Sequence, residues 1–90
     1  MNKPRRKQIE EVMSKIEALR SQLEDIMMEV ETIKDDEEEC LDNIPENLQG
    51  TERYEKAEEA VGNLEEAYDG LDDIGSQLED VVSRLEESMQ

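Results

Sequence analysis

The stretch IEEVMSKIEALRSQLEDIMMEVETI, residues 9–33, decides the fold of this 90-residue chain. Its apolar residues recur in alternating steps of three and four, as the a and d positions of a heptad repeat do. They are Ile9, Val12, Ile16, Leu19, Leu23, Ile26, Val30 and Ile33. Glu37 then takes the next a position and Cys40 the next d position. The pattern predicts an amphipathic coiled-coil helix over about residues 5–41.

The heptad pattern stops at LDNIPENLQG, residues 41–50. Pro45 cannot continue a helix, and it pushes the preceding Ile44 towards extended geometry. We therefore expect a loop over 42–50, with Ile44 and Leu48 folded back against the open end of the helices.

A second helix is predicted over about residues 51–88, with Thr51 as its N-cap. The three-four alternation returns there with Ala57, Ala60, Leu64, Ala67, Leu71, Ile74, Leu78, Val81 and Leu85. Gly70 and Gly75 weaken this helix, because each costs about 1 kcal/mol relative to Ala. We expect a continuous helix with a kink at 70–75; the alternative is a third helix that begins at Ser76.

Two helices of equal length and a short loop predict an all-α fold, a long antiparallel two-helix hairpin that forms one domain over residues 1–90. The basic cluster of residues 3–7 then lies beside the acidic C-terminus of the second helix, and the acidic run 35–39 lies beside its N-terminus. Some apolar residues widen the stripe on one flank, and we expect them to form a homodimer interface that completes a four-helix bundle. These residues are Met27, Val61, Tyr68 and Val82.

Composition narrows the classes of partner. The chain carries 27 acidic and 10 basic residues, for a net charge of −17. Such a charge disfavours nucleic acid and anionic membranes as direct ligands, and it favours a basic protein surface. No apolar run approaches the ~20 residues of a membrane span. A single cysteine, Cys40, indicates a reducing compartment.

The sequence contains little that predicts catalysis. It has no histidine, and the heptad predicts Cys40 to be a buried thiol without a base. The pairs Glu55/Glu58 and Glu66/Asp69 have the spacing of magnesium ligands in nucleotide pyrophosphatases, but a solvated helix face explains them more simply. We expect no enzyme activity, no cofactor and no metal site.

The acidic run is the predicted partner site, because it places Glu37 on the apolar seam and opposes the dipole of its own helix. We add the carboxylates that face it from the second helix. The full set is Asp35, Asp36, Glu37, Glu38, Glu39, Glu52, Glu55, Glu58 and Glu59. Beyond the basic cluster, the hairpin would carry about two-thirds of the linear charge density of duplex DNA. The charge density of the hairpin is therefore high enough for the protein to act as a DNA mimic.

Residues 39–60, ECLDNIPENLQGTERYEKAEEA, resemble a group of small proteins from phages and mobile elements of Gram-positive and gut bacteria. The group shares an acidic first helix, an Asp-Asn-x-Pro-Glu-Asn-Leu-Gln loop and a second helix rich in Glu, Ala and Leu. The resemblance implies a phage-related setting in the cytoplasm of a bacterial host, where small acidic proteins include anti-CRISPR and anti-restriction inhibitors. It carries over no catalytic residue.

The hypothesis at this point is an inhibitor that occupies the basic surface of a nuclease or another nucleic-acid-binding protein. The alternative is a structural or assembly subunit that only forms coiled coils.

Overall fold

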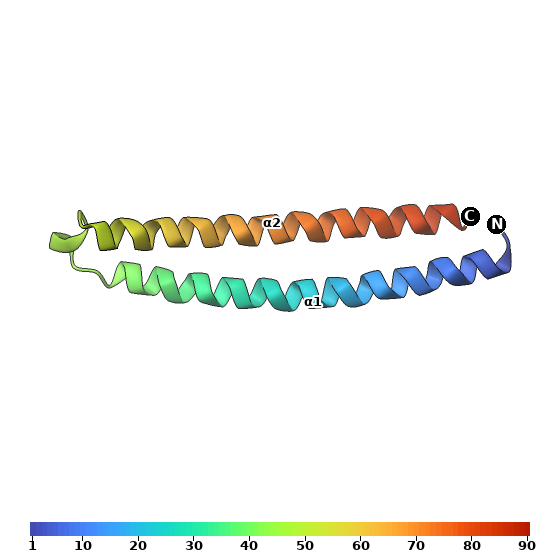
Figure 1. Ribbon diagram of the computed structural model, residues 1–90, viewed down its shortest axis with the longest axis horizontal. Helices are drawn as coiled ribbons and strands as arrows, with labels where there is room; N and C mark the ends of the chain where they lie inside the picture. Colours follow the sequence, from blue (N-terminus) through green and yellow to red (C-terminus); the bar gives the residue numbers. More distant parts are fainter.

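The computed structural model describes residues 1–90 and contains two long helices and one short turn. Helix α1 spans Lys3–Asp42, the 3₁₀ turn η1 spans Glu46–Leu48, and helix α2 spans Glu52–Ser88. The helices run antiparallel, with both termini at one end and the loop at the other (Figure 1). The Cα atoms extend over 70 × 16 × 13 Å. The predicted all-α helical hairpin is confirmed.

Each helix begins with a side-chain cap. The Asn2 side chain accepts a hydrogen bond from the Arg5 N–H at 2.9 Å, and Pro4 occupies the first turn, where its missing N–H costs nothing. The Thr51 hydroxyl accepts from the Tyr54 N–H at 3.3 Å, which confirms the predicted N-cap of α2. The same hydroxyl donates to the Leu48 carbonyl at 2.7 Å and so ties the cap to the loop.

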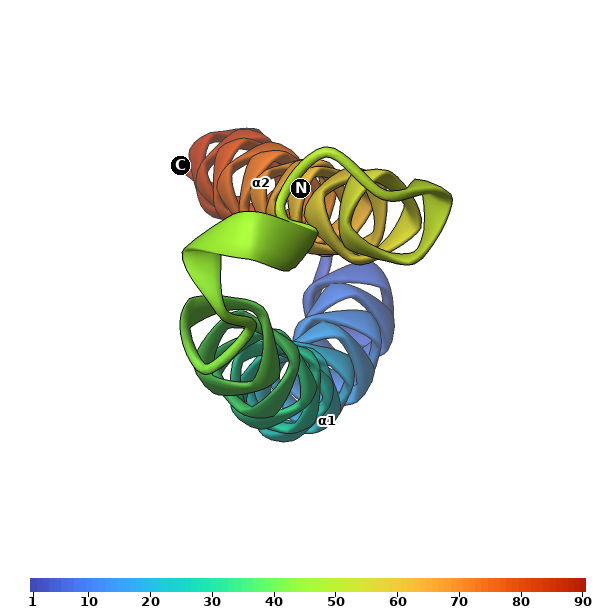
Figure 2. The same cartoon turned by 90° about the vertical axis from the view of Figure 1, so that its left-hand side faces the viewer.

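The loop closes the hairpin less completely than expected. Ile44 is half-buried, but Leu48 remains 45% exposed, so only Ile44 folds back against the helices. Helix α2 continues through Gly70 and Gly75, and it follows a gentle curve without the expected kink (Figure 1). Viewed from the loop, the two helices cross and wind around each other, as heptad repeats require (Figure 2).

The seam between the helices is made by two rows of residues on each helix, again in steps of three and four. On α1 these rows are Ile9, Met13, Ile16, Arg20, Leu23, Met27, Val30, Lys34, Glu37 and Leu41. On α2 they are Tyr54, Ala57, Val61, Leu64, Tyr68, Leu71, Gly75, Leu78, Val82, Leu85 and Met89. Only Leu23 and Val61 are buried, at 9% and 8% exposure, and no side chain is fully enclosed.

Half of the predicted seam is wrong. The a positions, such as Ile16 and Leu23, lie between the helices as expected. The predicted d positions of α1 lie outside: Val12, Leu19, Ile26 and Ile33 are 44–55% exposed, and Cys40 is exposed rather than buried. On α2, Ala67, Ile74 and Val81 are likewise exposed.

The four residues assigned to a dimer interface lie inside the hairpin instead. Val61 is buried in the seam, and Met27, Tyr68 and Val82 are half-buried there. Each helix carries an apolar stripe three rows wide, but two paired helices bury only two rows of each. The structure buries the row that contains Val61, Tyr68 and Val82 and leaves the competing row with Ala67, Ile74 and Val81 exposed.

Neither helix contains a segment that is long and apolar enough to cross a membrane.

Candidate protein-binding surfaces

The rod has two long faces of opposite character, and helical geometry decides which residues each face receives. Positions one residue after an a position lie on one side of the seam, and positions three residues after it lie on the other. Because the helices are antiparallel, equivalent rows of α1 and α2 emerge on the same side of the rod.

The first side, the acidic face, consists of an unbroken row of carboxylates from each helix. Every member is exposed. The row on α1 is Glu10, Glu17, Glu24, Glu31 and Glu38, and the row on α2 is Glu58, Glu65, Asp72, Glu79 and Glu86. Successive carboxylates in a row are about 10 Å apart along the rod, since each residue rises ~1.5 Å.

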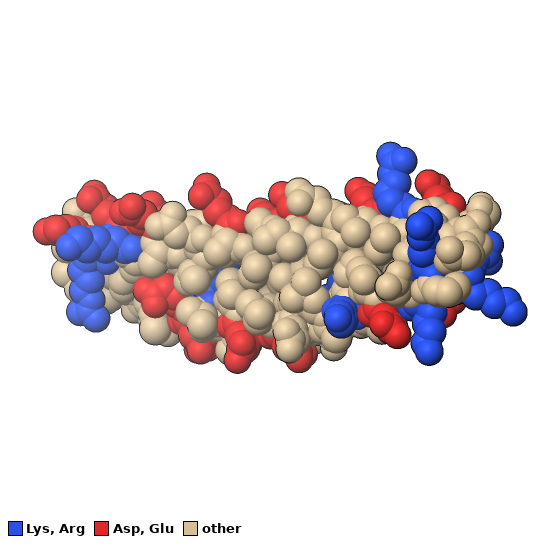
Figure 3. Space-filling view, turned by 45° about the vertical axis from the view of Figure 1, so that its right-hand side comes forward, with Lys and Arg blue, Asp and Glu red and all other residues tan.

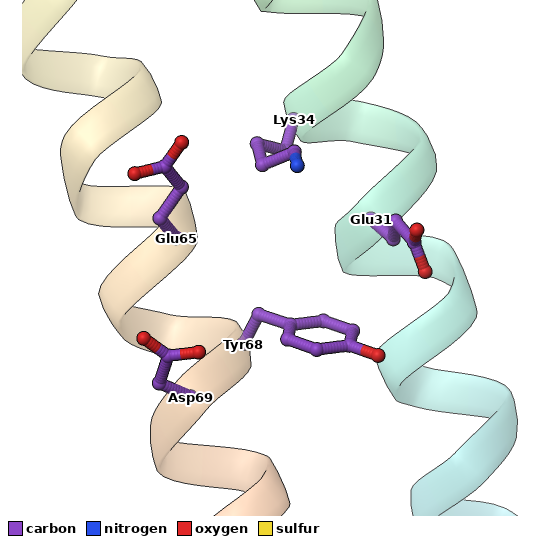
Figure 4. A pocket seen from close by; sticks show the side chains of 5 residues that line it. All are labelled: Glu31, Lys34, Glu65, Tyr68 and Asp69. Carbon is purple, nitrogen blue, oxygen red and sulfur yellow. The ribbon is translucent and has the colours of Figure 1, made fainter.

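Between the acidic rows, the seam opens into shallow hollows. One hollow of about 250 Å³ is lined by Glu31 and Lys34 of α1 and by Glu65, Tyr68 and Asp69 of α2. Figure 4 shows the Tyr68 ring reaching from α2 across to α1, with the carboxylates of both helices around it. Its volume is below the ~300 Å³ at which pockets for organic ligands begin.

Lys34 is held in this hollow by carboxylates. Its ammonium lies 3.4 Å from a carboxylate oxygen of Asp35, and its side chain is 24% exposed. Burial of the side chain lowers the pKa of Lys34, but the hydrogen bond that Lys34 donates to Asp35 and the charges of Asp35, Glu38 and Glu65 outweigh this effect. The pKa of Lys34 is therefore raised above its ordinary value of 10.5.

Arg20 has a similar place further along the acidic face. It lies in the seam, and its guanidinium donates to Glu17 at 3.0 Å. Arg20, Glu24, Asp72 and Glu79 line a second hollow. The hollows between the acidic rows thus contain two cations of the protein itself, Lys34 and Arg20, and each cation is flanked by more carboxylates than it can neutralise.

The residues predicted as the partner site come together at one end of the rod but not on one face. Only Glu38 and Glu58 belong to the acidic face. Glu37 lies half-buried in the seam, as predicted. Two of the others form ion pairs: Asp35 with Lys34, and Glu52 with Lys56 at 3.1 Å. The remaining carboxylates, Asp36, Glu39, Glu55 and Glu59, are exposed on other sides of the rod.

Sequence reasoning missed the acidic face. The signal was present, because each of the five residues that follow an a position of α1 is Glu. It was overlooked because the contiguous run 35–39 stands out in the linear sequence, whereas the acidic rows are spread over seven-residue intervals.

The opposite side, the apolar face, carries the rows that were wrongly assigned to the seam. Its members are Val12, Leu19, Ile26, Ile33 and Cys40 of α1, with Ala60, Ala67, Ile74 and Val81 of α2. Figure 3 shows a band of uncharged residues running along this face between acidic edges, with basic side chains gathered most densely at the end of the termini.

No three carboxylate or thiol groups converge in a geometry that could hold a metal ion. Comparison of the chain with protein-family models, with curated proteins and with solved structures gives no significant match.

Proposed function

We propose that this chain is a non-catalytic binding protein whose acidic face engages a basic surface of another protein. The observation that carries the proposal is the pair of parallel carboxylate rows on one side of the rod. Only three ion pairs form in the whole protein, and they involve Glu17, Asp35 and Glu52 among 27 acidic residues. Nearly all of the acidic face is therefore available to cations from outside.

The spacing of the carboxylates supports an extended basic partner. Charges repeated about every 10 Å along a rod 70 Å long match a groove lined with Lys and Arg better than a single basic residue. Grooves of that kind bind nucleic-acid backbones through their phosphates. The proposed partner is thus a nucleic-acid-binding protein, and occupation of its groove would exclude the nucleic acid.

A narrower version of the proposal is a phage-encoded inhibitor of a host defence nuclease, of the anti-CRISPR or anti-restriction type. It rests on the resemblance of residues 39–60 to phage and mobile-element proteins. A structural or assembly subunit is the second candidate, and the exposed apolar face favours it. Salt separates the two, because charge-driven binding weakens with ionic strength and apolar coiled-coil assembly does not.

The test begins with affinity capture of the partner from a bacterial lysate and continues with variants of matched charge. The face variant carries Glu24→Gln, Glu31→Gln, Glu65→Gln and Asp72→Asn. The control carries Glu11→Gln, Asp25→Asn, Glu66→Gln and Asp73→Asn, which remove four exposed carboxylates from the outer edges of the rod. Each lost contact between exposed charges is worth roughly 0.2–1 kcal/mol, so we expect the loss of four contacts to weaken binding of the face variant about 4- to 900-fold.

Binding is titrated at low and high salt, and labelled duplex DNA reports whether the chain displaces nucleic acid from the partner. We expect displacement by the native chain and the control, and much weaker displacement by the face variant. Equal weakening by both variants would show that only diffuse charge matters. Binding that persists unchanged in both variants would favour the assembly subunit.

A further inference from the structure

The apolar face is the least expected surface of this protein. Val12, Leu19, Ile26 and Ile33 form a continuous row of large aliphatic side chains at seven-residue intervals, each 44–55% exposed. Ile74 and Val81 of α2 add 47% and 45% exposed side chains on the same side. Isolated exposed apolar residues are ordinary, but a contiguous band along a rod marks a surface that another chain covers.

We propose that the apolar face is covered by a second copy of this chain, which lies antiparallel on the first and completes a four-helix bundle. The two-fold axis crosses the rod at the level of Ile26 and Ile74. Each α1 then packs on α1 of the second copy, and each α2 packs on α2. This inference concerns a different surface from the acidic face and does not depend on the proposed function.

The size of the face suits such a dimer. The Cα extents of 70 × 16 × 13 Å give this side of the rod roughly 900 to 1,100 Å², whereas a stable interface needs about 800 Å² per partner. An a, d and e stripe three rows wide is also the pattern of a helix that packs against two neighbours at once. One neighbour is supplied by the hairpin itself, and the second copy supplies the other.

The charges at the ends of α1 are compatible with the antiparallel arrangement. The end of the rod with the termini carries Lys3, Arg5, Arg6 and Lys7, and the loop end of α1 carries the acidic run 35–39. A two-fold axis along the rod would also pair opposite charges, because it places this basic cluster over Glu86 and Glu87 of α2, and disulfide formation distinguishes the two axes. An axis across it at Ile26 places the basic end of one copy over the acidic end of the other. It also brings Lys15 near Asp36 of the second copy, since both border the apolar row at about equal distances from Ile26.

The sizes of the side chains agree with the same axis. On α1, Leu19 meets Ile33 of the second copy, and on α2 the small Ala67 meets Val81. Both ends of the face are also hollowed. Met1, Ile9 and Val12 line a recess at one end. Cys40, Ile44 and Leu48 line a recess at the other. Each recess also contains an arginine, Arg5 in the first and Arg53 in the second, so both recesses are only partly apolar.

The dimer has a functional consequence. Because the apolar faces meet in the middle, the two acidic faces point outward on opposite sides of the bundle. The assembly would present two equivalent binding surfaces, which raises the apparent affinity for a partner that is itself dimeric.

The closing experiment uses disulfide formation on the two-fold axis. In a Cys40→Ser background, Ile26→Cys places a thiol opposite its own copy, and Ile74→Cys does the same on α2. Met28→Cys is the matched control, because Met28 is 66% exposed and lies on the far side of α1 from the apolar row. We expect mild oxidation to convert most of the Ile26→Cys and Ile74→Cys proteins to covalent dimers, with only background formation for the control.

Sedimentation equilibrium gives the mass of the unmodified protein in solution. One chain has a mass of 10.4 kDa, and we expect twice that value. Ile26→Asp should weaken the dimer at least about 100-fold, because it buries unpaired carboxylates in an apolar contact. A monomeric native protein at ~100 μM would overturn the proposal, since ordinary stable interfaces are fully formed at that concentration. The Ile26→Cys and Ile74→Cys proteins are also mixed and oxidised together. Disulfides that form only between one variant and the other would overturn the antiparallel arrangement, because they require rods that lie parallel.

Discussion

The placement of Leu19 and Leu23 tests the observed seam directly. Both are leucines of α1, and the heptad pattern alone assigns both to the core. The structure separates them, since Leu23 is 9% exposed in the seam and Leu19 is 49% exposed on the apolar face. Replacing each with alanine should therefore have unequal effects on the stability of the hairpin.

The expected magnitudes follow from burial. Leu23 packs over Gly75, and an added Cβ at Gly75 would lie 3.4 Å from its Cδ2 atom. Removing a buried leucine costs about 2–5 kcal/mol, and the open groove beside Leu23 places it near the lower end, at about 2–3 kcal/mol. Leu19 retains half of its contact with water, so its replacement should cost about 1 kcal/mol.

The assay is urea unfolding followed by far-UV circular dichroism, with both substitutions made in an Ile26→Asp background. That background keeps the chain monomeric, so burial of Leu19 by a second copy does not enter the comparison. The difference between the midpoints, multiplied by a common m value, gives the difference in the free energy of unfolding. Equal losses of unfolding free energy in both variants would refute the observed seam and favour the seam of a and d positions that the heptad pattern predicts.

Three further predictions concern local features of the hairpin. Gly62→Ala and Gly70→Ala should each stabilise the protein by about 0.8–1 kcal/mol in thermal unfolding, because neither new Cβ meets an atom within 4 Å and alanine favours the helix; destabilisation by either would mean that the helix is distorted there. Thr51→Ala should cost about 1 kcal/mol, measured by urea unfolding, through loss of the N-cap of α2, whereas Thr51→Ser should restore most of it. The raised pKa of Lys34 means that its contribution to stability is complete below pH 10.5 and is lost as the pH rises through the folded-state pKa. The native protein should therefore lose its advantage over Lys34→Met above that pH in parallel urea titrations, and a gap that stays constant would contradict the role of Asp35 and its neighbours.

The partner site was only partly accessible from the linear sequence. The run 35–39 is conspicuous there, and the structure places it in the half of the rod nearer the loop, although Lys34 just before it lies opposite Glu65 and Tyr68 and not beside the first turn of α2. However, consecutive residues on a helix point in different directions, so a contiguous run spreads around the rod. Residues such as Glu24 and Glu31 share a face because they are seven positions apart, which a search for charge runs does not register.

The sequence by itself determined that this protein is a helical hairpin. Periodicity specified two helices, Pro45 and its neighbours separated them, Thr51 began the second, and the a positions fell between them. Each of these features depends on local chain geometry, and local geometry is encoded within a few residues.

Only the tertiary structure decided which of two flanking rows entered the seam. The rows at Leu19 and Met27 lie on opposite sides of the a positions and are both largely apolar, so the pattern of one helix does not choose between them. In the antiparallel hairpin, the row that one helix buries fixes the row that the other helix buries, because both rows must lie on the same side of the rod. The structure buries the row that contains Val61 and Tyr68 on α2, although this places Arg20 and Lys34 of α1 in the seam, and that choice exists only once the two helices are packed together.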